Sequence, residues 1–116
     1  MKFEDLEVWK RSAALSAEIY LELTELKDFG FRDQITRSGL SISSNIAEGF
    51  ERNSDKETLN FLNYSKGSAG ELRSQIYIGI KIGNLPPEKG RYWINEVTEI
   101  SKMLYGLMQS IRNKIE

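Results

Sequence analysis

The feature that most constrains the fold is an apolar seam in the last third of the chain. Its members, separated by four and three residues in turn, are Trp93, Val97, Ile100, Leu104, Leu107 and Ile111. This spacing puts apolar side chains on one face of an α-helix, whereas in a strand every second residue shares a face. Residues 87–115 are therefore predicted to form a long amphipathic helix. Pro87 suits its first turn because proline lacks the N–H that has no acceptor there.

Three earlier segments show the same period. Residues 5–26 carry Leu6, Trp9, Ala13, Ser16, Tyr20 and Leu23, a stripe widened by Leu15, Ile19 and Leu26. Residues 31–50 carry Ile35, Gly39, Ile42, Ile46 and Phe50, and residues 54–83 carry Leu62, Ser65, Ala69, Leu72, Ile76 and Ile80. Ser54 and Glu57 at the start of the last segment match a capping box, in which each side chain accepts from a backbone N–H.

Short connections join these four segments, and none of the segments alternates as a strand does. Four amphipathic helices with short connections pack best as a bundle. We therefore predict an all-α, up-down-up-down, left-handed four-helix bundle, with residues 1–116 as a single domain. Trp9 and Trp93 are interpreted as core anchors, because aromatic side chains dominate buried area.

Composition narrows the chemistry. The chain has neither cysteine nor histidine, which removes disulfides, thiolate ligands, the commonest general base and the commonest transition-metal ligand. Glu48 and Glu71 are candidate carboxylates, but no metal-ligand spacing or phosphate-binding loop accompanies them. Gly67 and Gly70 lie inside a predicted helix and are interpreted as sites of close helix contact. We expect no enzymatic activity, no cofactor, no metal and no small-molecule substrate.

The amino-terminal residues are acidic where a secretory signal would be apolar, and no apolar run approaches the length of about 18 residues that a membrane span needs. A cytoplasmic protein without a membrane span is therefore expected.

Two predicted helices carry a second ordered face. Arg37, Ser41, Ser44 and Glu48 form one row opposite the apolar stripe of residues 31–50, and Tyr64, Glu71, Gln75, Ile78 and Ile82 form another on residues 54–83. Small polar side chains let another backbone approach, and three large apolar groups on an outer face form a patch that monomers avoid. The outer face of residues 87–115 is ordinarily polar. We interpret the two rows as a subunit interface; the alternative for the serine row is a solvated face, with Glu48 paired to Arg52.

The stretches FEDLEVWKRS (3–12), SISSNIAEGFERNSDKE (41–57) and FLNYSKGSAGELRSQI (61–76) resemble the four-helix-bundle proteins encoded within intervening sequences of bacterial 23S rRNA genes. The resemblance covers nearly the whole chain. It implies a ring-shaped homopentamer and no known enzymatic activity. A related group, the accessory proteins of diversity-generating retroelements, binds reverse transcriptase and nucleic acid through a strongly basic ring, whereas this chain has a net charge of −1.

Charge is nevertheless unevenly distributed. Residues 1–58 carry eight basic and twelve acidic side chains, for −4, and residues 59–116 carry eight and five, for +3. Candidate nucleic-acid contacts in the second half are Lys66, Arg73, Lys81, Arg91 and Lys102, with Lys89, Arg112 and Lys114 as further cations. The sequence thus favours a non-catalytic oligomeric scaffold that binds RNA or a protein acting on nucleic acid. The alternative is a self-assembling structural protein without a nucleic-acid role.

Overall fold

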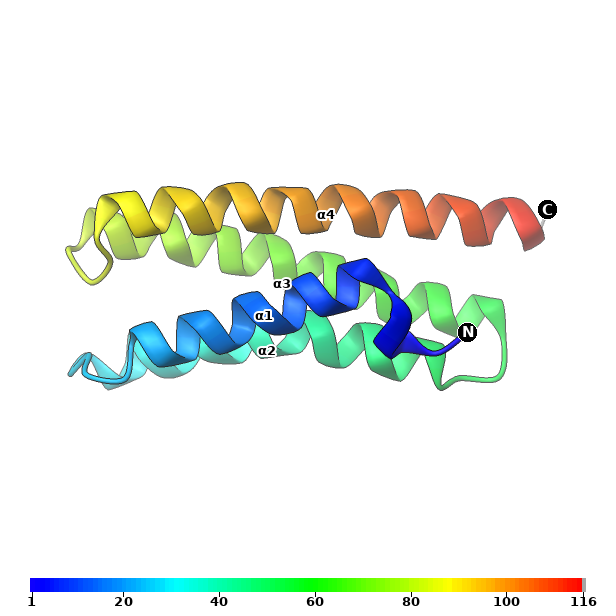
Figure 1. Ribbon diagram of the computed structural model, residues 1–116, viewed down its shortest axis with the longest axis horizontal. Helices are drawn as coiled ribbons and strands as arrows, with labels where there is room; N and C mark the ends of the chain where they lie inside the picture. Colours follow the sequence, from blue (N-terminus) through cyan, green and yellow to red (C-terminus); the bar gives the residue numbers. More distant parts are fainter. Residues whose placement is uncertain (116) are drawn as a thin grey trace.

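The computed structural model describes residues 1–115 as four α-helices preceded by one short 3₁₀ turn, Phe3–Asp5. The helices are α1 (Glu7–Glu22), α2 (Phe29–Phe50), α3 (Asp55–Lys81) and α4 (Pro87–Ile115). Successive helices run antiparallel along a molecule of 47 × 20 × 20 Å, and both termini lie toward the same end (Figure 1). No strand occurs in residues 1–115, so the predicted all-α four-helix bundle is confirmed.

Each helix packs against two neighbours: α1 and α3 both contact α2 and α4. The bundle therefore has four sides, one along each pair of adjacent helices. None of the helices in the described part of the chain is long and apolar enough to cross a membrane.

Side-chain caps fix where two helices begin. The Asp28 carboxylate accepts a hydrogen bond from the Phe31 N–H ahead of α2, and the Ser54 hydroxyl accepts from the Glu57 N–H ahead of α3, both at 3.2 Å. Only one of the two bonds of the predicted capping box is present. The Glu57 carboxylate accepts from the Ser54 hydroxyl at 3.3 Å and not from the Ser54 backbone N–H. Gly83 follows α3 with a φ of +81°, a conformation that glycine adopts without strain.

The first predicted helix, residues 5–26, is longer than the helix in the structure. α1 ends at Glu22, and the Thr24 hydroxyl donates to the backbone carbonyl three residues earlier at 2.8 Å, a local bond that competes with helix continuation. α2 begins at Phe29, two residues before the predicted start, because Asp28 caps it.

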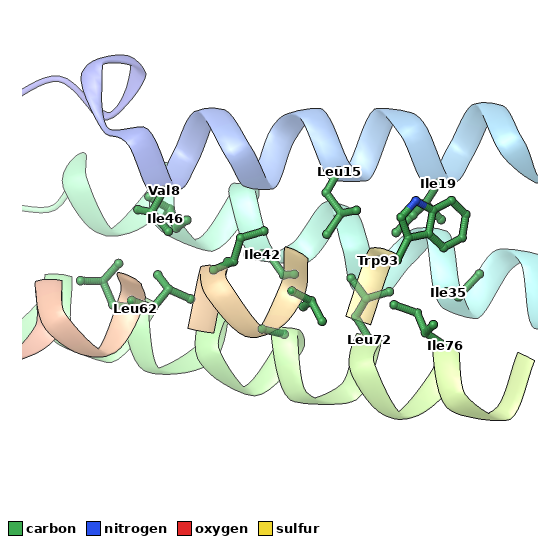
Figure 2. Close-up of a cluster of buried hydrophobic side chains, with 14 of the residues drawn as sticks. Val8, Leu15, Ile19, Ile35, Ile42, Ile46, Leu62, Leu72, Ile76 and Trp93 are labelled. Carbon is green, nitrogen blue, oxygen red and sulfur yellow. The ribbon is translucent and has the colours of Figure 1, made fainter. Parts of the chain in front are cut away.

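One cluster of buried apolar side chains runs the length of the bundle (Figure 2). Trp93 is fully buried in it and donates its indole N–H to Glu18 at 3.2 Å, so its interpretation as a core anchor is confirmed. Burying a large apolar side chain contributes roughly 1.5–3 kcal/mol to stability, which makes this cluster the main force holding the four helices together.

The core face of α1 is rotated from the predicted one. The buried side chains are Val8, Ser12, Leu15, Ile19 and Leu23, whereas the prediction relied mainly on Leu6, Trp9, Ala13, Ser16 and Tyr20. Tyr20 is 66% exposed, and Trp9 is half-buried with its ring edge-on to Phe3 at 5.1 Å between centroids. Leu6 and Trp9 still pack against the edge of the core, whereas the prediction was wrong for Tyr20. The apolar arc of α1 is wide, and periodicity alone does not say which half of a wide arc faces the core.

The seam of α4 is correct except at one position. Met108 is buried, and the predicted Leu107 is only half-buried. The buried positions 93, 97, 100, 104, 108 and 111 advance by 3.6 residues on average, which is the period of a straight α-helix. The predicted seam runs between the same two residues with the same average spacing, so periodicity does not distinguish Leu107 from Met108, and packing against the other helices decides which one is buried.

Glycines permit close contact at different places from those predicted. A Cβ at Gly90 would overlap the Ile80 side chain, so the missing side chain at Gly90 makes room for Ile80 of α3, which is half-buried. Gly67 and Gly70 are exposed with nothing within 4 Å of an added Cβ. The interpretation of these two glycines as sites of helix contact within the bundle was wrong, because they lie outside the core stripe of α3.

Candidate interaction surfaces

The two predicted interface rows lie on α2 and α3 and are linked across the side between these helices. At one end Glu48 pairs with Arg52 at 2.7 Å, and the Arg52 guanidinium lies 4.6 Å from the centroid of the Phe61 ring. Phe61 in turn makes an edge contact with Tyr64, with ring centroids 5.6 Å apart. A chain of contacts therefore joins the serine row (Arg37, Ser41, Ser44 and Glu48) to the apolar row of α3 (Tyr64, Ile78 and Ile82).

A second link lies near the middle of the same side. The Ser38 hydroxyl donates to the Glu71 carboxylate at 3.0 Å, and Ser65 donates to the Ile42 carbonyl at 2.7 Å. These bonds fix the position of α2 along α3, and therefore the position of the serine row relative to the apolar row. Gln75 lies half-buried on the same flank of α3 as Glu71.

The outward parts of both rows are open to solvent. On α2, Arg37, Ser44 and Glu48 are exposed and Ser41 is half-buried. On α3 the exposed fractions are 59% for Tyr64, 50% for Ile78 and 56% for Ile82. These three side chains are large, apolar and at least half exposed, and they follow one line along the end and middle of the helix.

A surface groove that the sequence did not indicate runs between α1 and α2. It has a volume of about 790 Å³, and its lining is mostly apolar: Trp9, Ala13, Ser16, Ala17, Tyr20, Leu21 and Leu40, with Asp33, Thr36, Arg37 and Ser43 from α2. The groove forms where the side chains of Ala13, Ser16 and Ala17 are small. The larger, exposed side chains of Tyr20, Leu21 and Leu40 line its edges. The signal that could have revealed it was the second half of the α1 apolar arc, which the sequence analysis assigned to the core.

The side between α1 and α4 is closed by ion pairs. Arg11 binds Glu96 through two nitrogens, at 2.7 and 3.0 Å, and Lys89 lies 3.3 Å from Glu18 and 3.6 Å from Glu22. The hydrogen bond from Arg11 lowers the pKa of Glu96, and the hydrogen bond to Glu18 raises the pKa of Lys89. Lys89 is thereby occupied on this side and does not join the other candidate nucleic-acid contacts.

The other contacts lie on the outer surfaces of α3 and α4. Lys66 and Arg73 lie on the flank of α3 opposite Glu71, which faces α2, and Lys81 lies farther round the helix, pointing away from the core. Arg91 and Lys102 lie on the outer surface of α4, pointing away from its core stripe and away from Glu96, which faces α1. All five are exposed, and we call this set the α3–α4 basic face.

The two carboxylates considered for catalysis, Glu48 and Glu71, each interact with a side chain of the same bundle. Glu48 is paired with Arg52, and Glu71 accepts from Ser38. Within residues 1–115, no cluster of three or more acidic side chains is arranged to hold a metal ion.

Comparison with known proteins identifies a family and a similar solved structure. The family model described as 23S rRNA-intervening sequence protein matches residues 4–106. A solved structure from Bacteroides thetaiotaomicron, described as a protein with unknown function from the S23 ribosomal protein family, is 30% identical with a TM-score of 0.82. The match covers 87% of this chain and 97% of that one. None of the curated proteins matches the sequence.

Proposed function

Because this chain belongs to the 23S rRNA-intervening sequence protein family, we propose that it is a non-catalytic scaffold that assembles with copies of itself and binds a macromolecular partner, either RNA or a protein acting on nucleic acid. The observation that carries the proposal is the exposed apolar surface on two adjacent sides of the bundle. One side has the α1–α2 groove, and the other has the apolar row of α3.

A second copy of the chain is the occupant that these two surfaces fit best. The groove is concave, and the row formed by Tyr64, Ile78 and Ile82 projects, so one copy can insert its row into the groove of the next. Charge agrees with this pairing, since Arg37 lines the groove and Glu71 lies along the row.

Such a contact joins two different patches and is therefore heterologous, and heterologous contacts close into rings when the rotation between copies allows. Patches on adjacent sides of the bundle turn each copy relative to the next, which favours a closed ring over a straight filament. The expected number of subunits, five, comes from the family resemblance described above.

Light scattering on the purified protein tests the assembly. A pentamer of the 13.3 kDa chain has a mass of about 66 kDa, five times the monomer. A mass of 13 kDa across micromolar concentrations would refute self-assembly, and a stable mass other than 66 kDa would refute the number five.

Substitutions on each surface test which residues make the contact. Leu40→Glu puts a charge into the groove, Ile78→Glu puts one into the apolar row, and Ser44→Arg puts a long side chain into the serine row. Each variant is expected to shift the protein toward the monomer. Asn113→Arg, at an exposed position of α4, is the matched control and should leave the mass unchanged. If Ser44→Arg also leaves it unchanged, the serine row is a solvated face.

The alternative function is a self-assembling structural protein with no nucleic-acid role. The overall charge of −1 favours it, because dedicated nucleic-acid binders are strongly basic. Titration with RNA at two salt concentrations separates the two functions, since the logarithm of affinity for phosphates falls linearly with the logarithm of salt concentration.

A further inference from the structure

In the part of the chain that the structure describes, cations without an ion pair are concentrated on the outer surfaces of α3 and α4. Ion pairs within residues 1–115 occupy Arg11, Lys89 and Arg52 elsewhere, but they include none of Lys66, Arg73, Lys81 and Arg91. The fifth cation of the α3–α4 basic face, Lys102, has only an exposed pair with Glu99 at 3.6 Å. Exposed pairs of this kind contribute little, so Lys102 is available to a ligand.

The fold places the positively charged half of the sequence on one side of the molecule. The second half of the chain, which carries the excess of +3, is α3 and α4, and these helices lie next to each other (Figure 1). The sequence has no acidic residue between Glu71 and Glu88, and Glu71 faces α2. From Lys66 to Lys81, over about 22 Å at 1.5 Å per residue, the surface of α3 away from α2 therefore carries cations and neutral side chains but no acidic one.

Two tyrosines stand among these cations. Tyr77 lies four residues from both Arg73 and Lys81, so the three share one line along α3, and it is 57% exposed. On α4, Tyr105 follows Lys102 by three residues and is 55% exposed. The sequence analysis did not place aromatic side chains among the cations, although the spacing of Arg73, Tyr77 and Lys81 within one helix could have revealed the first of the two tyrosines.

The close contact of Ile80 with Gly90 fixes how the two helices are aligned. Counting back along antiparallel helices, Lys81 lies at the level of the start of α4, and Lys66 lies at the level of Lys102 and Tyr105. Tyr77 and Tyr105 are then separated by about 20 Å along the bundle axis, with Lys66, Lys102 and Arg73 between them and Arg91 and Lys81 beyond Tyr77.

The α3 backbone is uncovered in the middle of this surface. Gly70 lies between Lys66 and Arg73, is exposed, and has nothing within 4 Å of an added Cβ. A glycine inside a helix lowers stability by about 1 kcal/mol relative to alanine, and packing within the bundle offers no reason for it here. It leaves room for a chain of phosphates and sugars to lie close to the helix.

We propose that the α3–α4 basic face binds a single-stranded segment of nucleic acid. Lys66, Arg73, Lys81, Arg91 and Lys102 neutralise its phosphates, and Tyr77 and Tyr105 stack on its bases. Stacking requires bases that are not paired in a duplex, which is why a single strand fits this surface and a double helix does not. This inference names the partner of the proposed scaffold and rests on that proposal.

Fluorescence anisotropy on the full chain tests the inference. The probes are a labelled 20-nucleotide RNA, a DNA of the same mixed-pyrimidine sequence, and the RNA annealed to its complement. The single strands are expected to bind more tightly than the duplex, with an affinity that falls as salt rises. Tighter binding of RNA than of DNA would identify contacts to the 2′-hydroxyl, and equal binding would show that phosphates and bases suffice; both support the site. Preference for the duplex would overturn it.

Matched variants test the residues. Tyr77→Leu and Tyr105→Leu remove the ring faces, and each should weaken single-strand binding at least fivefold, the lower end of what stacking on one base contributes. Tyr92→Leu is the control, because Tyr92 is 53% exposed on α4 but turns away from α3. Arg73→Gln should lower both the affinity and the salt dependence, whereas Lys10→Gln on α1 should change neither. Binding that survives both α3–α4 tyrosine substitutions would refute the stacking.

The two proposals fail in different ways. Light scattering on the same samples reports the mass, and circular dichroism reports the fold of each variant. An assembled protein that binds no single strand even at 20 mM salt overturns this inference and leaves the scaffold intact. A monomer that binds the single strand overturns self-assembly and leaves the basic face intact.

Discussion

The most direct test of the packing compares one chemical change at two positions of α3. Gly70→Ala and Gly79→Ala both add a methyl group to the same helix, nine residues apart. In each case the helix gains intrinsic stability, because glycine is the less favourable residue by about 0.8–1 kcal/mol. The surroundings of the new Cβ decide whether that gain remains.

The two environments are opposite. A Cβ at position 70 meets nothing within 4 Å, so we expect Gly70→Ala to stabilise the protein by about 0.5–1 kcal/mol. A Cβ at position 79 would lie 2.7 Å from Leu85 Cδ1 and 2.7 Å from Phe31 Cζ, and Leu85 is only 2% exposed. Overpacking a core costs about 1–3 kcal/mol, and two large side chains must move here, which places the cost in the upper half of that range. After the gain in helix propensity, Gly79→Ala should destabilise the protein by about 1–2 kcal/mol.

Urea unfolding followed by circular dichroism measures both effects as a shift of the midpoint at unchanged slope. All samples must share one protein concentration, since self-association makes apparent stability depend on it. Gly67→Ala is a second open position and should behave like Gly70→Ala. Stabilisation by Gly79→Ala, or destabilisation by Gly70→Ala, would contradict the packing described for α3.

Three further predictions concern stability. Because Arg11 lowers the pKa of Glu96, the stabilisation from this pair is present above the ordinary value of 4.5 and is lost as pH falls through the folded pKa. Glu96→Gln should therefore be less stable than the wild type at pH 7, and the difference should shrink as pH falls below 4.5, as measured by urea unfolding. Trp93→Phe removes the bond to Glu18 and leaves a void, and should lower stability by about 1–3 kcal/mol; an unchanged melting temperature would contradict its place in the core. EDTA should leave the melting temperature unchanged, and a sharp drop would reveal a structural metal ion.

The sequence by itself determined the number of helices, their order and most of the core. It succeeded where the apolar stripe is narrow, as on α4, because a narrow stripe at helical spacing has only one face that can be buried. The caps at Ser54 and Pro87 could likewise be read from a few adjacent residues, since capping is a local interaction.

Tertiary structure decided which half of a wide apolar arc faces inward and which residues from different helices lie together. On α1 the choice between the stripes containing Leu15 and Tyr20 depends on how the helix rotates against α2 and α4, and this rotation left Tyr20 beside a groove. The α3–α4 basic face likewise depends on the alignment of two antiparallel helices, which the contact of Ile80 with Gly90 sets. Helical period relates residues within one segment, whereas these surfaces arise from packing between segments.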